Sequence, residues 1–241
     1  MPYTRSNTMI QRIVILNSKG GSGKSTLATN LAGGFASRGE ATMLVDHDPQ
    51  GSSIRWLDLR PAEAPAIHGV AAFRRPKGGE TRAFQMRVPP GTRRMVVDSP
   101  AAISDLANLE YVQHAHLILV PVLPSPVDIH AVTRFIQDLL LHARVRQRGI
   151  PVGIVANRVR ANTLAYSALR RFLRTLKLPL LTYLRDTQHY VRVAGIGLSV
   201  LEMRGRQYRR DQELWEPLLR WIDRQAELRE RSIEGGKRDG A

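Results

Sequence analysis

Short apolar runs alternate with helical periodicities along most of this chain. Residues 12–17 (RIVILN) form a β-branched run that stops at a glycine-rich turn, and residues 25–38 then carry apolar side chains at helical spacing. Gly39 closes this helix, and a second apolar run follows at residues 41–45. The pattern predicts a strand, a helix and a buried parallel strand in succession.

Three later apolar runs repeat this arrangement. Residues 95–97, 117–122 and 152–156 each end at a polar residue or proline and alternate with helical stretches. We therefore expect an α/β fold with a single-domain, doubly wound, mostly parallel sheet and helices on both faces. Residues 1–231 should form this domain, and residues 232–241 should form a polar, disordered tail.

The remaining segments are less regular. Prolines and arginines interrupt residues 60–94, which predicts short strands and exposed loops. Residues 162–177 carry one apolar face and several basic residues away from it, which predicts an amphipathic basic helix. Residues 212–229 show another helical stripe.

The composition is strongly basic. The 241 residues include 36 Lys and Arg against 21 Asp and Glu, a formal net charge of +15. This balance favours a polyanionic partner, with nucleic acid first and an anionic membrane second. A basic protein whose composition simply favours arginine is the alternative.

Two absences narrow the chemistry. The chain has no cysteine, which excludes disulfides, thiolate metal sites and cysteine nucleophiles. No run approaches the roughly 18 apolar residues of a membrane span, and residues 1–11 lack the apolar stretch of a signal peptide. We expect a cytoplasmic protein.

The first glycine-rich turn has the composition of a phosphate-binding loop. It lies between a predicted strand and a predicted helix, the context that such a loop requires. Its glycines let the backbone approach phosphate, Lys24 can meet the β- and γ-phosphates, and Ser25 can ligate Mg²⁺. The candidate loop consists of Lys19, Gly20, Gly21, Ser22, Gly23, Lys24, Ser25 and Thr26.

The loop resembles the deviant Walker A motif of the ParA/MinD ATPases, because Lys19 stands at its start in addition to Lys24. Further segments are similar to the same family over residues 12–202. They are residues 46–52, which resemble the Walker A′ segment of the ParA branch, residues 96–100, which resemble Walker B and switch II, residues 121–128, and Asn157.

The resemblance implies ATP and Mg²⁺ as cofactors and a homodimer that closes around ATP. Lys19 would reach the partner's nucleotide, Asp48 would position or polarise the attacking water, and Asn157 would contact adenine. Asp98 would hold the Mg²⁺ shell through water, and Asp46 would support that shell and the loop geometry. Carboxylates after strands are also common helix caps, which is the alternative for Asp46 and Asp98.

Some residues depart from the pattern or lack support for a role. Ser99, Pro100 and Ala101 replace the two prolines that often follow the Walker B acid, so the switch II conformation stays open. His47 lies between two acids, but His114 and His116 have no further ligands at zinc spacing, and we assign no zinc site.

Within the family, the sequence favours a ParA-type positioning ATPase. Reductases and arsenite-pump ATPases rely on cysteines, MinD-like members end in an amphipathic membrane helix, and the related tyrosine kinases end in a tyrosine cluster. This sequence shows none of these three features. A segment before the first strand large enough for a helix-turn-helix is also missing, so the chain should not read an operator by itself.

The resemblance then implies ATP-dependent, sequence-independent DNA binding on the nucleoid, no membrane partner, and hydrolysis stimulated by a ParB-like or cargo adaptor protein. The cargo could be a plasmid, a chromosome or a protein assembly. Candidate DNA contacts could equally form a solvated helix face. They are Arg170, Arg171, Arg174, Arg204, Arg206, Arg209 and Arg210.

Two other functions remain open. One is a metabolic P-loop enzyme, such as an ATP-dependent ligase or small-molecule kinase, whose basic residues bind an acidic substrate. The other is a nucleotide-dependent scaffold with negligible hydrolysis, against which Asp48 argues. ATP turnover stimulated by DNA or a partner, without consumption of a small substrate, would exclude the metabolic enzyme.

Overall fold

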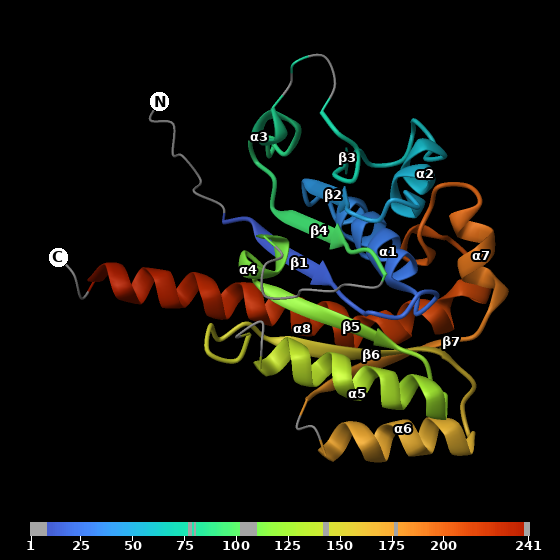
Figure 1. Ribbon diagram of the computed structural model, residues 1–241. Coiled ribbons are helices and arrows are strands. Elements are labelled where there is room, and N and C mark those ends of the chain that lie inside the picture. Colours follow the sequence, from blue (N-terminus) through green and yellow to red (C-terminus); the bar gives the residue numbers. More distant parts are fainter. Residues whose placement is uncertain are drawn as a thin grey trace.

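The computed structural model describes residues 9–76, 79, 81–101, 110–141, 145–175 and 178–238. Its centre is a seven-stranded sheet with the order β3-β2-β4-β1-β5-β6-β7, in which every neighbouring pair is parallel (Figure 1). The predicted α/β, doubly wound fold is therefore confirmed. The strands are β1 (Gln11–Ile15), β2 (Thr42–Asp46), β3 (Ile67–Ala71), β4 (Arg94–Asp98), β5 (Leu117–Val122), β6 (Val152–Val159) and β7 (Leu180–Arg185).

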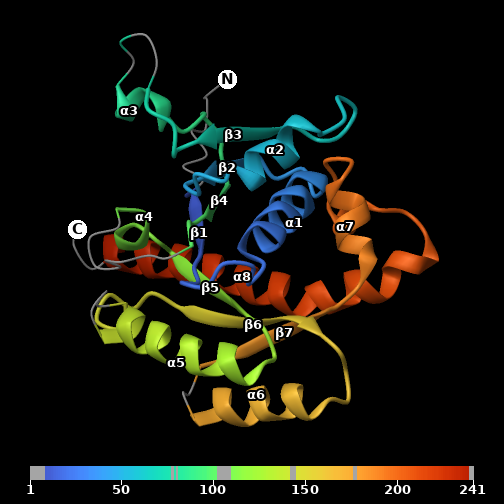
Figure 2. The ribbon, with the colours of Figure 1, turned by 45° about the vertical axis from the view of Figure 1, so that its right-hand side comes forward.

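Helices cover both faces of the sheet (Figure 2). The helices α4, α5 and α6 pack on one face, and α1, α7 and α8 pack on the other. Within the described ranges, no helix is both long enough and apolar enough to span a bilayer. The helices are α1 (Lys24–Ser37), α2 (Ser52–Asp58), α3 (Arg82–Gln85), α4 (Glu110–Gln113), α5 (Pro126–Leu141), α6 (Leu164–Thr175), α7 (Gln188–Ala194), the 3-10 helix η1 (Val200–Glu202) and α8 (Arg206–Arg238).

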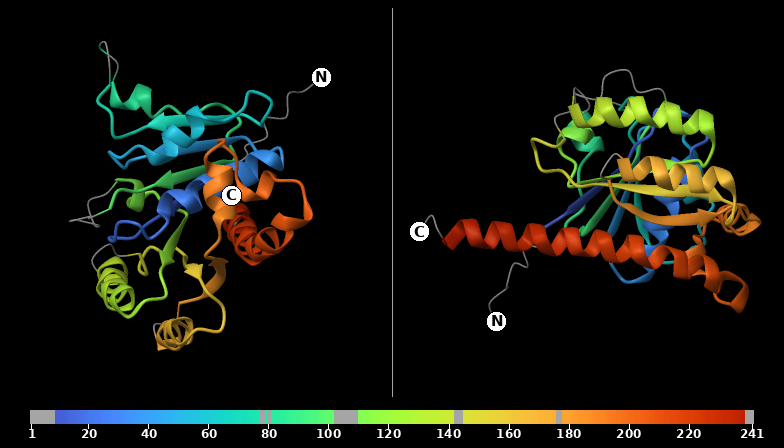
Figure 3. Two further views of the ribbon diagram at one scale, coloured as in Figure 1. Left: turned by 90° about the vertical axis from the view of Figure 1, so that its right-hand side faces the viewer. Right: turned by 90° about the horizontal axis from the view of Figure 1, so that it is seen from below.

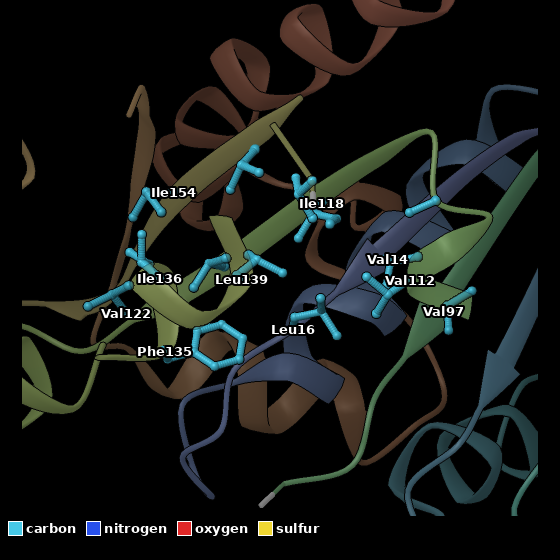
Figure 4. Close-up of a cluster of buried hydrophobic side chains, with 14 of the residues drawn as sticks. Val14, Leu16, Val97, Val112, Ile118, Val122, Phe135, Ile136, Leu139 and Ile154 are labelled. Carbon is cyan, nitrogen blue, oxygen red and sulfur yellow. The ribbon is translucent and has the colours of Figure 1, made fainter. Parts of the chain in front are cut away.

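The central strands read as continuous apolar runs because they are buried on both sides. Val14 of β1 and Leu16, which follows this strand, lie in the hydrophobic cluster beneath α5. Phe135 belongs to the same cluster (Figure 4). Ile13 and Ile15, which alternate with them, belong to the cluster beneath α1 and α8. This alternation in a parallel sheet leaves no solvated face for polar residues.

The C-terminal region differs from the sequence prediction. The helix predicted at residues 212–229 is α8, which begins at Arg206 and continues to Arg238, so it extends into the segment predicted to be a disordered tail. Residues 223–233 are rich in Glu, Gln, Arg and Leu, which are strong helix formers, and the next glycine is Gly235. Figure 3 shows α8 extending beyond the sheet at its C-terminal end.

Other segments follow the prediction in part. The edge strand β3 and the short helix α3 lie in the region predicted to hold short strands and loops. The predicted basic helix is α6, and the last two residues of its predicted range, 176–177, lie outside the described residues, as do residues 239–241. The sequence analysis proposed no counterpart for β7, α7 or η1.

Candidate nucleotide-binding site

The predicted phosphate loop leaves the carboxyl end of β1 and enters α1. Asn17, directly after the strand, fixes its start, since its side-chain amide donates to the Pro121 carbonyl at 2.7 Å and its oxygen accepts from the Lys19 N–H at 2.8 Å. Gly23 is the N-cap of α1, and Lys24 is its first residue. The loop therefore presents the N-terminal end of a helix, where unpaired N–H groups and the helix dipole favour an anion.

Two glycines of the loop have left-handed backbone. Gly21 has φ of 73° and Gly23 has φ of 97°. A Cβ atom at Gly23 would lie 1.9 Å from the Asn157 Nδ2 atom, whereas a Cβ atom at Gly21 would have open space around it. Gly23 is thus required for both its conformation and its contact.

Asn157 joins the loop from the end of β6. The side chain is buried, its Nδ2 donates to the Ser22 carbonyl at 2.9 Å, and its Oδ1 accepts from the Arg158 N–H at 2.9 Å. The structure therefore brings Asn157, which lies within β6, together with the phosphate loop. In this arrangement its amide holds the loop backbone.

Lys24 is buried inside the loop, with 6% of its surface exposed. Its Nζ donates to the Lys19 carbonyl at 3.3 Å. Burial lowers the pKa of Lys24, and the nearby carboxylates of Asp98 and Asp48 act in the opposite direction. A desolvated ammonium group among backbone donors is suited to meeting a phosphate chain.

Asp46, at the end of β2, is fully buried and saturated with donors. Its Oδ1 accepts from the Asp48 N–H at 2.9 Å, and its Oδ2 accepts from the N–H groups of Ser53 at 3.1 Å and Ile54 at 3.2 Å. Burial raises its pKa, and these backbone bonds oppose that shift. Asp46 therefore caps α2 and fixes the loop between β2 and α2, which agrees with the helix-cap alternative.

Asp98, at the end of β4, lies beside Asp46 in the register of the sheet. Its Oδ2 accepts from the Ser53 hydroxyl at 2.6 Å, while its buried Oδ1 has no partner within the described residues. Burial raises the pKa of Asp98 to about 6, and the hydroxyls of Ser53 and Ser25 lower it. An orphaned buried carboxylate oxygen close to a serine hydroxyl fits Mg²⁺ and its water shell, because Mg²⁺ takes oxygen ligands.

Asp48 and His47 lie in the loop that follows β2. Asp48 is partly exposed, and its Oδ1 accepts from the Gln50 N–H at 2.9 Å. His47 donates its backbone N–H to the Asp98 carbonyl at 2.9 Å, and its ring stacks on Tyr111 with centroids 4.4 Å apart. Burial, aided by Arg82, lowers the pKa of His47 to about 4, so this imidazole is neutral near pH 7.

Switch II is described only as far as Ala101. Ser99 is fully buried, and a Cβ atom at Gly20 would lie 3.9 Å from the Ala101 Cβ atom. The segment after the Walker B acid therefore starts against the phosphate loop, and its continuation at residues 102–109 lies outside the described residues.

A cavity of about 500 Å³ adjoins the loop on the side of β7. It is lined by Thr26, Asn157, Arg158, Ala194 and most of residues 185–191, a segment for which the sequence predicted no role. Arg185 is held there by the buried carboxylate of Asp211, at 2.8 Å. No local pattern marks this segment, because the cavity forms only where α7 packs near α1.

The candidate DNA contacts are all exposed but form two groups. Arg170, Arg171 and Arg174 lie on α6, which contacts β7 through the Tyr166 and Tyr183 rings, 5.5 Å apart. The other group surrounds the start of α8, on the opposite face of the sheet. The seven arginines therefore flank the edge strand β7 from the two faces of the sheet.

Comparison with known proteins identifies the family. A family model described as the CobQ/CobB/MinD/ParA nucleotide binding domain matches residues 13–200. The chain belongs to this family. It is 30% identical over 217 residues to "Maintenance of carboxysome distribution protein A" of Gloeobacter kilaueensis, covering 88% of this chain and 94% of that protein. The protein of the same name from Halothiobacillus neapolitanus is 29% identical, over 80% of this chain and 88% of its own length.

Other relatives match a shorter part. The chromosome-partitioning ATPase Soj of Thermus thermophilus is 46% identical over 59 residues, 24% of this chain and 23% of Soj. Among solved structures, apo McdA of Cyanothece has a TM-score of 0.64 at 14% identity, covering 90% of this chain and 99% of McdA. A plasmid partition protein of Borrelia burgdorferi bound to AMPPNP has a TM-score of 0.65 at 14% identity, over 88% and 99% of the two chains. These likenesses agree with the fold.

Family and site together establish the biochemical class. The chain is an ATPase of the ParA/MinD family, and ATP and Mg²⁺ are its cofactors. The phosphate loop, the buried Lys24 and the open oxygen of Asp98 are the features of this chain that fit those cofactors.

Proposed function

We propose that this ATPase is a positioning switch that dimerises with ATP, binds DNA without sequence preference in that state, and is released when a partner protein stimulates hydrolysis. The observation that carries the proposal is a phosphate loop with a buried Lys24 and a second lysine, Lys19, at its entrance. The net charge of +15 supports a polyanionic surface as the place where it acts.

The nucleotide is held by residues already in place. Backbone N–H groups of residues 20–26 and the start of α1 receive the phosphates, and Lys24 meets the β- and γ-phosphates. Ser25 and Asp98 hold Mg²⁺ and its waters, which supplies charge neutralisation when it is bound. Asp46 supports this shell indirectly by fixing the loop that carries Asp48.

Other residues bind the adenosine group and orient the attacking water. Asn157 and the cavity lined by residues 185–191 receive the adenosine group. Asp48 orients the attacking water, since its carboxylate is partly exposed beside the phosphate loop and accepts only a surface N–H among the bonds described. Lys19 reaches the nucleotide of the partner in the dimer, so that dimerisation reports the nucleotide state.

The cargo is a protein assembly. The relatives that match nearly the whole chain are named for carboxysome distribution, whereas the chromosome-partitioning ATPase Soj matches about a quarter of it. The protein then acts on the nucleoid in the cytoplasm, and an adaptor on the cargo stimulates hydrolysis. The metabolic-enzyme alternative is less supported, because the relatives that match most of the chain are named for positioning and not for a metabolic reaction.

Two lysine variants test this proposal. Lys24→Ala should weaken ATP binding by about a hundredfold, because it deletes a buried cation that faces two phosphates. Lys19→Ala should leave ATP binding by the monomer nearly unchanged and should prevent the ATP-dependent dimer. The measurements are calorimetry with MgATP and sedimentation with ATP or ADP.

The same proteins should then be tested on unrelated DNA duplexes. Wild-type protein should bind them equally with ATP and weakly with ADP, and neither variant should bind in the ATP state. DNA binding that is independent of nucleotide, or an ATP dimer that survives Lys19→Ala, would contradict the proposed switch.

A further inference from the structure

The stripe of α8 that faces the sheet changes character along its length. Trp215, Leu218 and Ile222 are buried in the core beneath the sheet. The same helical spacing continues with Gln225, Arg229 and Ser232, where α8 passes the amino ends of the strands (Figures 1 and 3). The sequence thus places polar groups on the inward side of the helix beyond Ile222.

These polar groups line a cavity of about 610 Å³, which we name the amino-edge cavity. It lies before β5 and β6, at the end of the sheet opposite to the phosphate loop, so it is separate from the nucleotide site. No acidic side chain is among its described lining residues. They are Gln113, Ala115, His116, Arg148, Gly149, Ile150, Pro151, Gln225, Leu228, Arg229 and Ser232.

Arg229 is the central observation. Its Nη1 atom is buried and has no hydrogen-bond partner in the described part of the protein. Burial, followed by the charge of Arg12, lowers the pKa of Arg229, but a guanidinium group remains protonated at physiological pH. A buried guanidinium nitrogen without a partner is costly, and here it belongs to a side chain that is otherwise only partly buried.

His116 is a neutral ring beside this cation, and the backbone of Ile10 and Arg12 engages it. Its Nδ1 accepts from the Arg12 N–H at 2.9 Å, so the neutral ring carries its proton on Nε2. Burial lowers the pKa of His116 to about 4, and the charges of Arg229 and Arg12 contribute to that shift. Arg12, Arg229 and His116 therefore form a group whose members oppose each other's positive charge.

Other arginines in the same chain are paired. Arg94, also at the amino end of the sheet, binds Glu40 at 2.5 Å and Asp223 at 2.6 Å. Arg60 is likewise paired with Glu202. Arg94 and Arg60 are therefore neutralised by carboxylates, whereas the half-buried Arg229 has no ion pair among the described residues and can offer its Nη1 atom to an anionic ligand.

We propose that the amino-edge cavity binds a small phosphorylated anion. The Arg229 guanidinium provides a fixed charge with parallel N–H donors, Arg148 adds a second charge from the loop before β6, and the hydroxyl of Ser232 adds a neutral donor. The concave shape and the volume suit a compact ligand, and the site goes beyond the proposed DNA and nucleotide binding.

The test uses the full chain with its phosphate loop saturated by MgADP. Inorganic phosphate and pyrophosphate are titrated into wild-type protein, Arg229→Met and Arg148→Gln, with Arg224→Met as the matched control. Arg224 is an exposed arginine on the same helix. We expect binding to wild-type protein and Arg224→Met alike, and binding at least tenfold weaker to Arg229→Met and Arg148→Gln.

A second readout separates this role from a structural one. Without phosphate, Arg229→Met should be at least as stable to urea as wild-type protein, because it removes a partly buried charge whose Nη1 atom has no described partner. Equal phosphate binding by wild-type protein and Arg229→Met, or a large loss of stability in that variant, would overturn the proposal. So would phosphate binding that a saturating DNA duplex abolishes, since the cavity would then belong to the DNA surface.

Discussion

The carboxyl ends of β2 and β4 lie side by side, and each carries an aspartate, but the two aspartates have different hydrogen-bond partners. Asp46 and Asp98 are paired in the register of the sheet, and both are fully buried. Asp46 accepts three backbone N–H bonds, whereas Asp98 accepts the Ser53 hydroxyl at Oδ2, has the Ser25 hydroxyl close by, and leaves Oδ1 without a described partner. The number of donors aimed at each carboxylate separates a structural acid from one that is available to a cofactor.

Ser53 connects the two ends. Its backbone N–H donates to Asp46, and its hydroxyl donates to Asp98. Ser53, at the start of α2, therefore binds Asp46 through its main chain and Asp98 through its side chain. The comparison can be tested by changing the two acids and this serine separately.

The largest effect should come from Asp46→Ala. The substitution leaves the N–H groups of Asp48, Ser53 and Ile54 without an acceptor at the end of a buried strand. We expect the free energy of unfolding to fall by about 4 kcal/mol, since each orphaned donor costs roughly 1–3 kcal/mol. Urea denaturation is the measurement, with Asp48→Ala as a control that should lose less than about 1 kcal/mol. Equal losses in the two variants would remove the distinction.

Asp98→Asn should raise the free energy of unfolding in the absence of Mg²⁺ and nucleotide, opposite to the effect of Asp46→Ala. The pKa of Asp98 is raised from 3.8 to about 6, so ionisation costs stability progressively between those pH values and by a constant amount above them. The amide avoids that cost, and we expect a gain of roughly 2–3 kcal/mol near neutral pH. The gain should vanish near pH 4. A variant less stable than wild-type protein at both pH values would show that the carboxylate is structural.

Ser53→Ala should have the smallest effect. Its backbone bond to Asp46 persists, and only the hydroxyl bond to Asp98 is lost. We expect a change in unfolding free energy of about 1 kcal/mol or less and a further upward shift of the Asp98 pKa, visible by NMR titration against Asp98→Asn. A loss as large as that of Asp46→Ala would mean that the hydroxyl, and not the backbone cap, organises α2.

The sequence predicted the parts of the molecule that depend on local pattern. Residues 12–17 and 41–45 read as buried strands because both faces of a parallel sheet are covered, and the phosphate loop was recognisable between a strand and a helix. The roles of Asp46 and Asp98 could not be separated this way. They depend on where α2 begins relative to two neighbouring strands.

Features created by contacts between distant segments were missed for the same reason. The segment 185–191 becomes part of a cavity only because α7 packs near α1, and Arg185 is held by Asp211 from α8. Likewise, the seven candidate arginines are exposed as expected, but their separation by the sheet could not be read from spacing. Arg206→Ala with Arg209→Ala and Arg170→Ala with Arg174→Ala should therefore be compared as separate pairs on DNA.

The most direct test of the nucleotide switch is the behaviour of Asp48→Ala on DNA. The variant keeps the phosphate loop, Lys24 and the acids that fix its surroundings, so it should bind ATP and remain on a DNA-coated surface after free ATP is washed out. Phosphate release should fall by about a hundredfold or more, because the group that orients the water is lost. Wild-type protein should leave the surface as it hydrolyses ATP. A variant that releases phosphate and dissociates from DNA at the wild-type rate would contradict the account.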